Sequence, residues 1–118
     1  MPRFMLLMHP ADFPAPGEPP PPELVAQMMK FNGELAEAGV LLALDGLMQP
    51  DQGARVRFAG GRPSVTDGPY TESKELIGGY WIIQASSMEE AVQWASRAPC
   101  LDGDMIEVRP IQPVPGDV

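Results

Sequence analysis

The sequence predicts a single α+β domain, in which short strands lie on either side of two separated helices. Two segments carry apolar residues at helical spacing, and several shorter segments have the apolar content or the alternation typical of strands. Apolar residues make up 44% of the chain, which is enough to bury a core without a disulfide or a structural metal. We therefore expect residues 1–118 to form one domain.

The first part of the chain predicts a strand, a helix and a second strand. Residues 3–8, RFMLLM, are apolar on both alternating faces, so both faces of this strand should be covered. A proline-rich stretch ends the strand, and Pro22 suits the first turn of a helix that Gly39 should terminate. The apolar stripe of this helix is Leu24, Met28, Phe31, Leu35 and Ala38. Residues 40–44, VLLAL, predict a buried strand.

A β-hairpin should follow. Residues 54–59, ARVRFA, alternate apolar and basic side chains. Gly60 and Gly61 can adopt the positive φ that a two-residue turn requires, and residues 62–66 lead back. One face of this hairpin should therefore be in water.

The last part of the chain predicts a strand, a helix and a strand. Residues 79–85, GYWIIQA, are apolar on both faces, which places this strand in the interior of the sheet. Ser86 or Ser87 can cap a helix with a stripe over residues 88–95, because each serine stands three residues before a glutamate. Residues 105–111, MIEVRPI, alternate again and predict the final strand.

This order of elements indicates a ferredoxin-like α/β sandwich with an inserted β-hairpin, in which both helices cover one face of an antiparallel sheet. The other face would be bare, although the strands at residues 4–8 and 80–83 are apolar on both sides. An exposed apolar patch of that size is unusual on a soluble monomer. We therefore expect a homodimer in which two copies pack their open sheet faces together around a two-fold axis.

The composition excludes several classes of function. Eight basic residues against 16 acidic ones give a net charge of −8, which repels a nucleic-acid backbone. No apolar run reaches the roughly 18 residues that cross a membrane, and the amino terminus is unlike a secretory signal, so we expect a cytoplasmic protein. One cysteine, Cys100, and one histidine, His9, predict neither a metal site nor a cofactor.

Residues 65–83, VTDGPYTESKELIGGYWII, resemble the signature of the YCII-related, or DGPF, domain family, in which Asp-Gly-Pro precedes a charged segment and a glycine pair before a strand. Residues 30–47, 53–65, 88–99 and 106–111 are also similar to the family. The resemblance implies a ferredoxin-like domain that dimerises into an α+β barrel. It also implies a functional link to a sigma factor of the extracytoplasmic-function type. Tyr70 replaces the family's usual phenylalanine, and the histidine that often follows the position of Leu47 is absent.

The segment at Asp67-Gly68-Pro69 is most simply a turn, because aspartate, glycine and proline each favour turn geometry. A ligand-binding role is the alternative. Asp67 would then accept or donate a proton and Tyr70 would donate a hydrogen bond beside a pocket. Glu72 and Lys74 are typical of a solvated helical turn, although Lys74 could also hold an anionic ligand.

His9 and Asp45 are the candidate catalytic residues, since an imidazole and a carboxylate are the usual groups for proton transfer. Asp45 leaves the second strand, and in β-α-β topology the first strand ends opposite the start of the second, so the pair would need a short second strand or a partner from elsewhere. Two hypotheses follow. The favoured one is a non-catalytic dimer that binds a small molecule or a regulatory partner, and the alternative is a lyase or isomerase that uses His9 or Asp45.

Overall fold

The structure of the protein is a computed structural model. It describes residues 1–12, 18–67 and 76–115, with the backbone alone at Asp67. The elements are β1 (Arg3–His9), α1 (Pro22–Glu37), β2 (Leu41–Gly46), the short 3₁₀ helix η1 (Pro50–Gln52), β3 (Ala54–Ala59), β4 (Arg62–Asp67), β5 (Gly79–Gln84), α2 (Met88–Ala95) and β6 (Met105–Pro110). Every predicted strand and helix is present, and the stated boundaries agree within two residues.

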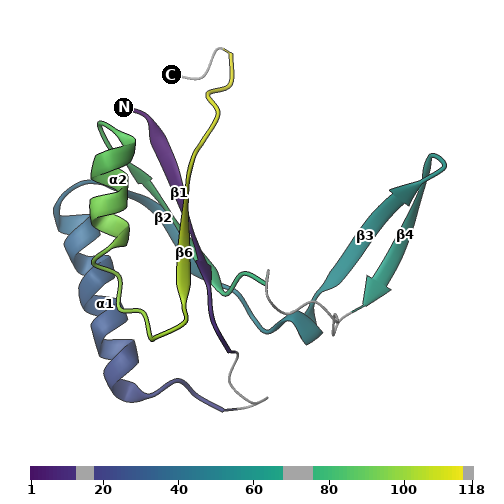
Figure 1. The fold of residues 1–118 in the computed structure, drawn as a ribbon, viewed down its shortest axis with the longest axis horizontal. Helices are drawn as coiled ribbons and strands as arrows, with labels where there is room; N and C mark the ends of the chain where they lie inside the picture. Colours follow the sequence, from purple (N-terminus) through teal and green to yellow (C-terminus); the bar gives the residue numbers. More distant parts are fainter. Residues whose placement is uncertain (13–17, 68–75, 116–118) are drawn as a thin grey trace.

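The main sheet is antiparallel and has four strands in the order β2-β5-β1-β6. Both helices lie on one face of it (Figure 1). The predicted α+β class is therefore confirmed. The hairpin β3–β4 stands between β2 and β5 in the sequence and forms a separate two-stranded sheet.

The ends of α1 follow from its sequence. Pro22 occupies the first helical position, where its missing amide hydrogen costs nothing. At the other end, Gly39 adopts φ of +75°, and the amide groups of Gly39 and Val40 donate to the carbonyl groups of Ala36 and Leu35. This pair of hydrogen bonds is a Schellman motif, which needs the left-handed conformation that glycine accepts. The predicted terminator is therefore confirmed.

Two glycines near the end of α1 should respond to alanine in opposite directions. Gly39→Ala forces a Cβ atom into a positive-φ position and should cost about 1 kcal/mol of unfolding free energy. Gly33 lies inside the helix with open space around its Cα, so Gly33→Ala should stabilise the protein by about 0.5–1 kcal/mol. Urea unfolding of both variants measures the difference. Two changes of the same sign would contradict this account of the helix end.

The core lies between the helices and the sheet. Phe4 and Leu6 of β1 alternate inward, and they are joined by Trp81 and Ile83 of β5. The α1 residue Phe31 meets the Trp81 ring edge to face, with the ring centroids 5.4 Å apart. The remaining buried residues are Leu35, Val40, Ala85 and Ala91.

The opposite face of the sheet carries apolar side chains too. Met5, Leu7 and Ile82 lie on it and are half-buried, and no helix or strand within the described ranges packs over them (Figure 1). The expectation that β1 is covered on both faces is thus not met by one chain. The prediction of a buried β2 is wrong for part of the strand, because β2 is an edge strand with an irregular register and an exposed Leu42.

Of the two serines predicted to cap α2, Ser87 is the one that does so. Ser87 is the N-cap residue, and its hydroxyl accepts a hydrogen bond from the Glu90 amide at 3.1 Å. The Glu90 carboxylate reaches back and accepts from both the amide and the hydroxyl of Ser86. These two hydrogen bonds lower the pKa of Glu90 below its ordinary value. The glutamate therefore fixes the residue before the cap, one position earlier than in a capping box.

Candidate functional site

A small cavity of about 140 Å³ lies between α1 and the end of the sheet where β1 and β2 finish. Its lining residues come from β1, α1, β2 and β5 and from the connection before β5: Met8, Met28, Asn32, Leu44, Asp45, Gly46, Gly78, Gly79, Tyr80 and Trp81. A cavity of roughly this size holds a ring of about six carbon atoms. Most of the named side chains are apolar, and three polar ones stand among them. This combination is typical of small-molecule sites.

Asn32 is held in one orientation by the core. The indole Nε1–H of Trp81 donates to Oδ1 of Asn32 at 2.8 Å. An indole nitrogen can only donate, so the oxygen of the amide must face Trp81. The amide NH₂ group of Asn32 then points away from the indole, and among the described residues it has no hydrogen-bond partner. The cavity therefore has a fixed hydrogen-bond donor in its wall.

Asp45 and Tyr80 lie beside the cavity where β2 ends and β5 begins, with their side chains on the open face of the sheet, because the neighbouring Leu44 and Trp81 face the core. The two residues are paired across β2 and β5, and the Tyr80 hydroxyl donates to Oδ2 of Asp45 at 3.3 Å. This contact positions the carboxylate and leaves Oδ1 able to accept another hydrogen bond. The predicted candidate Asp45 is thus part of the cavity lining.

The glycine pair before β5 allows the backbones to approach closely beside the cavity. A Cβ atom on Gly79 would lie 3.0 Å from the carbonyl oxygen of Asp45 and 3.3 Å from Cα of Gly46. A Cβ atom on Gly78 would lie 3.2 Å from the ring of Pro10. The two glycines therefore let β5 start between the ends of β1 and β2, which sets the width of the cavity.

His9 lies near this end of the sheet but outside the cavity lining. β1 and β2 are both antiparallel to β5, so they run in the same direction and finish at the same end. The expected need for a short second strand is wrong, because Asp45 stands at the end of β2 and not at its start. Since β5 lies between β1 and β2, two strand spacings, about 10 Å, separate the backbones of His9 and Asp45. The structure does not bring the two side chains together.

The imidazole of His9 is largely buried, with 13% of the side chain exposed. Its Nε2 atom lies 3.4 Å from Oε1 of Glu107, yet neither ring nitrogen makes a hydrogen bond within the part of the chain that the structure describes. A buried polar group without a partner destabilises the folded state. The two ring nitrogens of His9 are also available to a substrate or a second chain.

We expect His9→Leu to raise the free energy of unfolding by about 1 kcal/mol, because it removes two buried nitrogens that lack partners. Chemical unfolding of the variant and of the wild type measures this difference. His9→Gln is the control, since it keeps polar atoms at the site and should not stabilise. A loss of about 1 kcal/mol in His9→Leu would instead show that the ring nitrogens are satisfied in solution.

Other predicted site residues cannot be placed. Tyr70, Glu72 and Lys74 lie outside the described residues, and for Asp67 the backbone pairs with Ala54 at the end of β4. Sequence reasoning missed Asn32. A signal for it was present, because Asn32 follows Met28 of the apolar stripe by one helical turn and is polar where the stripe continues.

Two further observations bear on the chemistry. The pKa of Cys100 is raised by desolvation and, to a smaller extent, by the charge of Asp104, which keeps the thiol protonated and unreactive at neutral pH. Within the described ranges, no three His, Cys, Asp or Glu side chains gather as ligands for a metal ion.

The helices that the structure describes include none with the length and apolarity to span a membrane.

Three larger depressions of about 540 to 610 Å³ lie elsewhere on the surface. One follows α2 and β6, one lies at the base of the hairpin, and one adjoins the two ends of the chain. We place the candidate site in the smaller cavity, because there an apolar wall surrounds an oriented donor.

The sequence is similar to known proteins over most of its length. It is 36% identical over 78 residues to an uncharacterised protein of Rhizobium meliloti (strain 1021). The match covers 64% of this chain and 62% of that relative, so the chain spans less than two thirds of the relative's length. The sequence pattern of the YCII-related domain matches residues 3–115. The chain therefore belongs to the YCII-related domain family.

Proposed function

We propose that this protein is a homodimer that binds a small molecule in the cavity between α1 and the ends of β1 and β2. The observation that carries the proposal is the Asn32 amide, which Trp81 fixes with its NH₂ group available to a ligand. A fixed donor loses no entropy when it binds, and this favours one ligand geometry over others.

The cavity indicates the class of the ligand. The apolar side chains of Met8, Met28 and Leu44 suit a small ring or a branched carbon chain. The Asn32 donor suits a carbonyl oxygen on the ligand. Because the described lining holds no Lys or Arg to pair with a carboxylate, we expect a neutral carbonyl compound such as an amide.

Dimerisation through the open sheet face is part of the proposal. The strand order β2-β5-β1-β6, with both helices on one face, supports a ferredoxin-like domain. Met5, Leu7 and Ile82 supply apolar area on the face without helices. Two such faces packed together would give the dimeric α+β barrel expected for the family.

A second candidate function is proton transfer by His9, as in a lyase or an isomerase. The observation that favours it is the buried imidazole with two unpartnered nitrogens. Asp45 is too distant to orient this ring, so Glu107 would take that role at 3.4 Å from Nε2. Turnover of a carbonyl compound by the wild type would establish this function, provided that His9→Gln abolishes turnover and leaves binding of the compound unchanged.

Two parts of the sequence prediction stand as further proposals. Asp67, Tyr70, Glu72 and Lys74 are proposed to contact the ligand, because their segment leads directly to Gly78 and Gly79 in the cavity lining. A regulatory link to a sigma factor in the cytoplasm is the alternative role for the dimer. Co-purification with such a factor would test this role. The amount of sigma factor recovered should change when the ligand is added.

Benzamide is a suitable first probe, since its ring fills a cavity of this size and its carbonyl can accept from Asn32. At ten times its dissociation constant it should add about 1.4 kcal/mol to the stability and raise the melting temperature by several degrees. Asn32→Asp keeps an acceptor for Trp81 but removes the NH₂ donor, so this shift should disappear. Gln93→Ala, on the exposed part of α2, is the matched control and should keep it. Equal shifts in all three proteins would overturn the assignment.

A further inference from the structure

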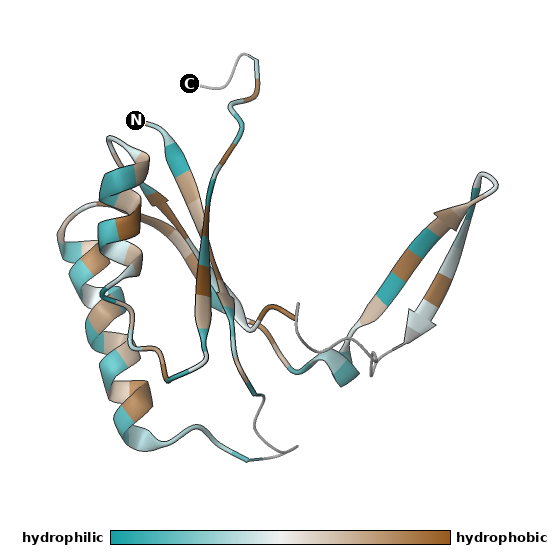
Figure 2. Cartoon of the chain, viewed as in Figure 1, coloured by the Kyte–Doolittle hydropathy of each residue, from teal (hydrophilic) through white to brown (hydrophobic). Residues whose placement is uncertain are grey.

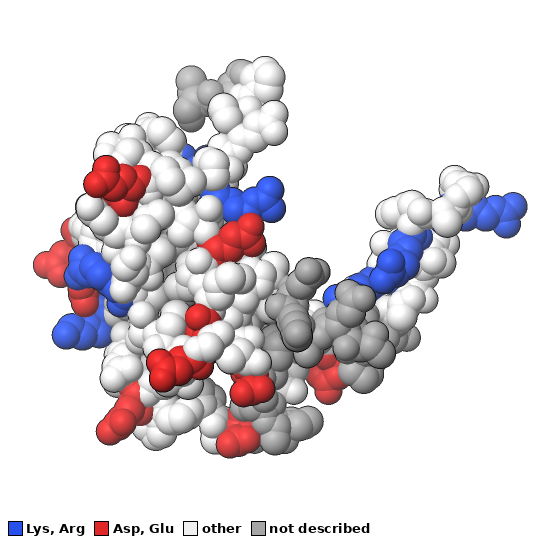
Figure 3. All heavy atoms as spheres, viewed as in Figure 1, with Lys and Arg blue, Asp and Glu red and all other residues white. Residues whose placement is uncertain are grey.

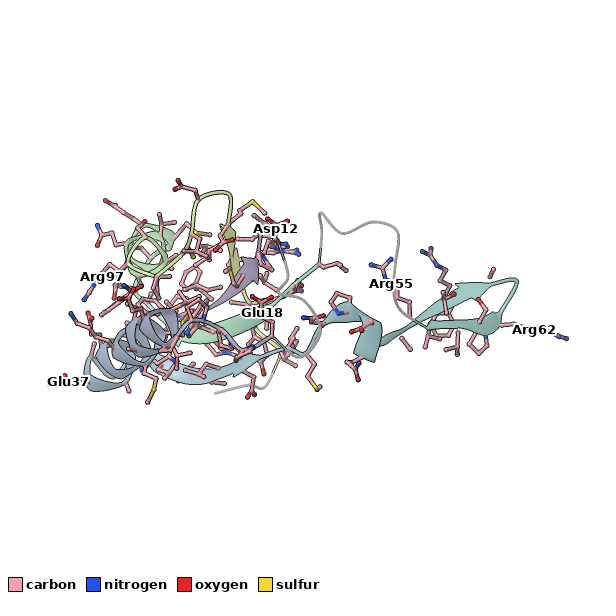
Figure 4. The ribbon with its side chains drawn as sticks, turned by 90° about the horizontal axis from the view of Figure 1, so that it is seen from below. Asp12, Glu18, Glu37, Arg55, Arg62 and Arg97 are labelled. Carbon is pink, nitrogen blue, oxygen red and sulfur yellow. The ribbon has the colours of Figure 1, made fainter. Side chains whose placement is uncertain are left out.

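The hairpin β3–β4 extends from the body as an arm, which we define as residues 54–67. It projects on the side of the sheet away from the helices, as two perpendicular views show (Figures 1 and 4). The radius of gyration is 16.3 Å, whereas a compact domain of this length has about 13.5 Å. The arm therefore reaches into the space that faces the open side of the sheet.

The two faces of the arm differ in chemistry. The register pairs Val56 with Val65 and Phe58 with Pro63, so these four side chains share one face. The other face carries Arg55, Arg57 and Arg62 together with Ser64 and Thr66. Brown and teal bands alternate along β3, and β4 carries one brown band between pale ones (Figure 2).

The apolar face of the arm is exposed to solvent. Val56 is 52% exposed, Phe58 77% and Val65 66%. An isolated two-stranded hairpin is only marginally stable in water and normally needs a further strand or a packed surface. Burying these side chains would supply that support, because removing apolar area from water stabilises the packed arrangement.

The charge of the arm is opposite to that of the body. Residues 54–67 contain three arginines and one aspartate, whereas residues 1–53 and 76–115 contain four basic and twelve acidic side chains. In the space-filling view, blue side chains mark the arm and red ones dominate the visible body (Figure 3). Figure 4 places Arg55 and Arg62 on the arm, far from Glu37 and Arg97 at the helical side. The net charge of the arm favours its approach to an acidic body, while the arginines themselves lie on the face opposite to Val56, Phe58 and Val65.

We propose that the arm docks on a second copy of this chain, with Val56, Phe58 and Val65 packed against the body of the partner. The inference rests on the proposed dimer, since a copy seated on the open sheet face lies on the side to which the arm projects. Two-fold symmetry makes the contact reciprocal, so each dimer contains two arms and two docking surfaces. The arm thus adds a second interface to the one between the sheets.

Sedimentation equilibrium of the full chain tests the arm separately from the sheet face. The dissociation constant of the dimer should rise tenfold or more in Phe58→Ser and in Val65→Ser, because buried aromatic and aliphatic anchors dominate interfaces. Thr66→Ala, on the polar face of the arm, is the matched control and should change it less than about twofold. If the wild type is a dimer and both serine variants have the same dissociation constant, the arm does not dock on the partner, whereas the sheet interface still stands. A monomeric wild type would overturn both.

A photo-crosslinking amino acid identifies what the arm touches. Benzoylphenylalanine in place of Val56 should yield a covalent species of twice the 12.8 kDa chain mass. The same group in place of Arg57 should yield little of it, because this position lies on the other face of the arm. Crosslinks confined to a single chain, or equal yields from the two positions, would contradict docking on a second copy.

Discussion

Leu35→Ala is expected to destabilise the protein by about 3–5 kcal/mol, which is the largest effect we anticipate from a single substitution. Leu35 is fully buried on the inner face of α1 and belongs to the cluster that joins α1 to β1 and β5. Truncation removes its transfer free energy and leaves a void between helix and sheet. Chemical unfolding, followed by circular dichroism, gives the free-energy difference.

Met29→Ala is the matched control in the same helix. Met29 is 68% exposed, so its truncation should change the unfolding free energy by less than about 0.5 kcal/mol. Similar effects of the two substitutions would mean that α1 does not pack on the sheet as described.

Ile82→Asp is expected to raise the dissociation constant of the dimer at least a hundredfold. Ile82 lies on the open face of β5, next to Met5 of β1 in the register. A carboxylate buried between two packed sheets is costly, even though Arg3 and Arg109 lie on the same sheet face. Sedimentation equilibrium at micromolar concentration measures the change.

The folding of this variant needs its own measurement. Circular dichroism should show an unchanged helix content in the monomer, since Ile82 is not part of the core cluster between helices and sheet. Met29→Asp places the same charge on the outer side of α1 and should leave the dimer intact. A dimer that survives Ile82→Asp would show that the open face is not the interface.

Local signals predicted most of the fold. Pro22, Gly39 and the apolar stripe of α1 act within one segment, so the boundaries of this helix could be inferred from nearby residues. The glycine pair Gly60 and Gly61, with φ of 59° and 78°, likewise determined the hairpin turn.

The site was harder to predict because it depends on contacts between distant segments. Asn32 is 49 residues from Trp81, and only the packing of α1 against β5 makes its amide a fixed donor. The error over His9 and Asp45 came from comparing the end of the first strand with the start of the second, although Asp45 lies at the end of its strand and the two strands run in the same direction. The exposure of Leu42 also depends on strand order, since an edge position is not visible in an apolar run.

The most direct test of the ligand-binding proposal uses the side-chain amide of Asn32. Asn32 is the single asparagine of the chain, so selective ¹⁵N-asparagine labelling gives one pair of side-chain amide resonances. Titration with benzamide should move this pair in a saturable way, and the indole resonance of Trp81 should move with it. Resonances that stay in place up to the solubility limit of benzamide and of comparable neutral carbonyl compounds would contradict the proposed binding site.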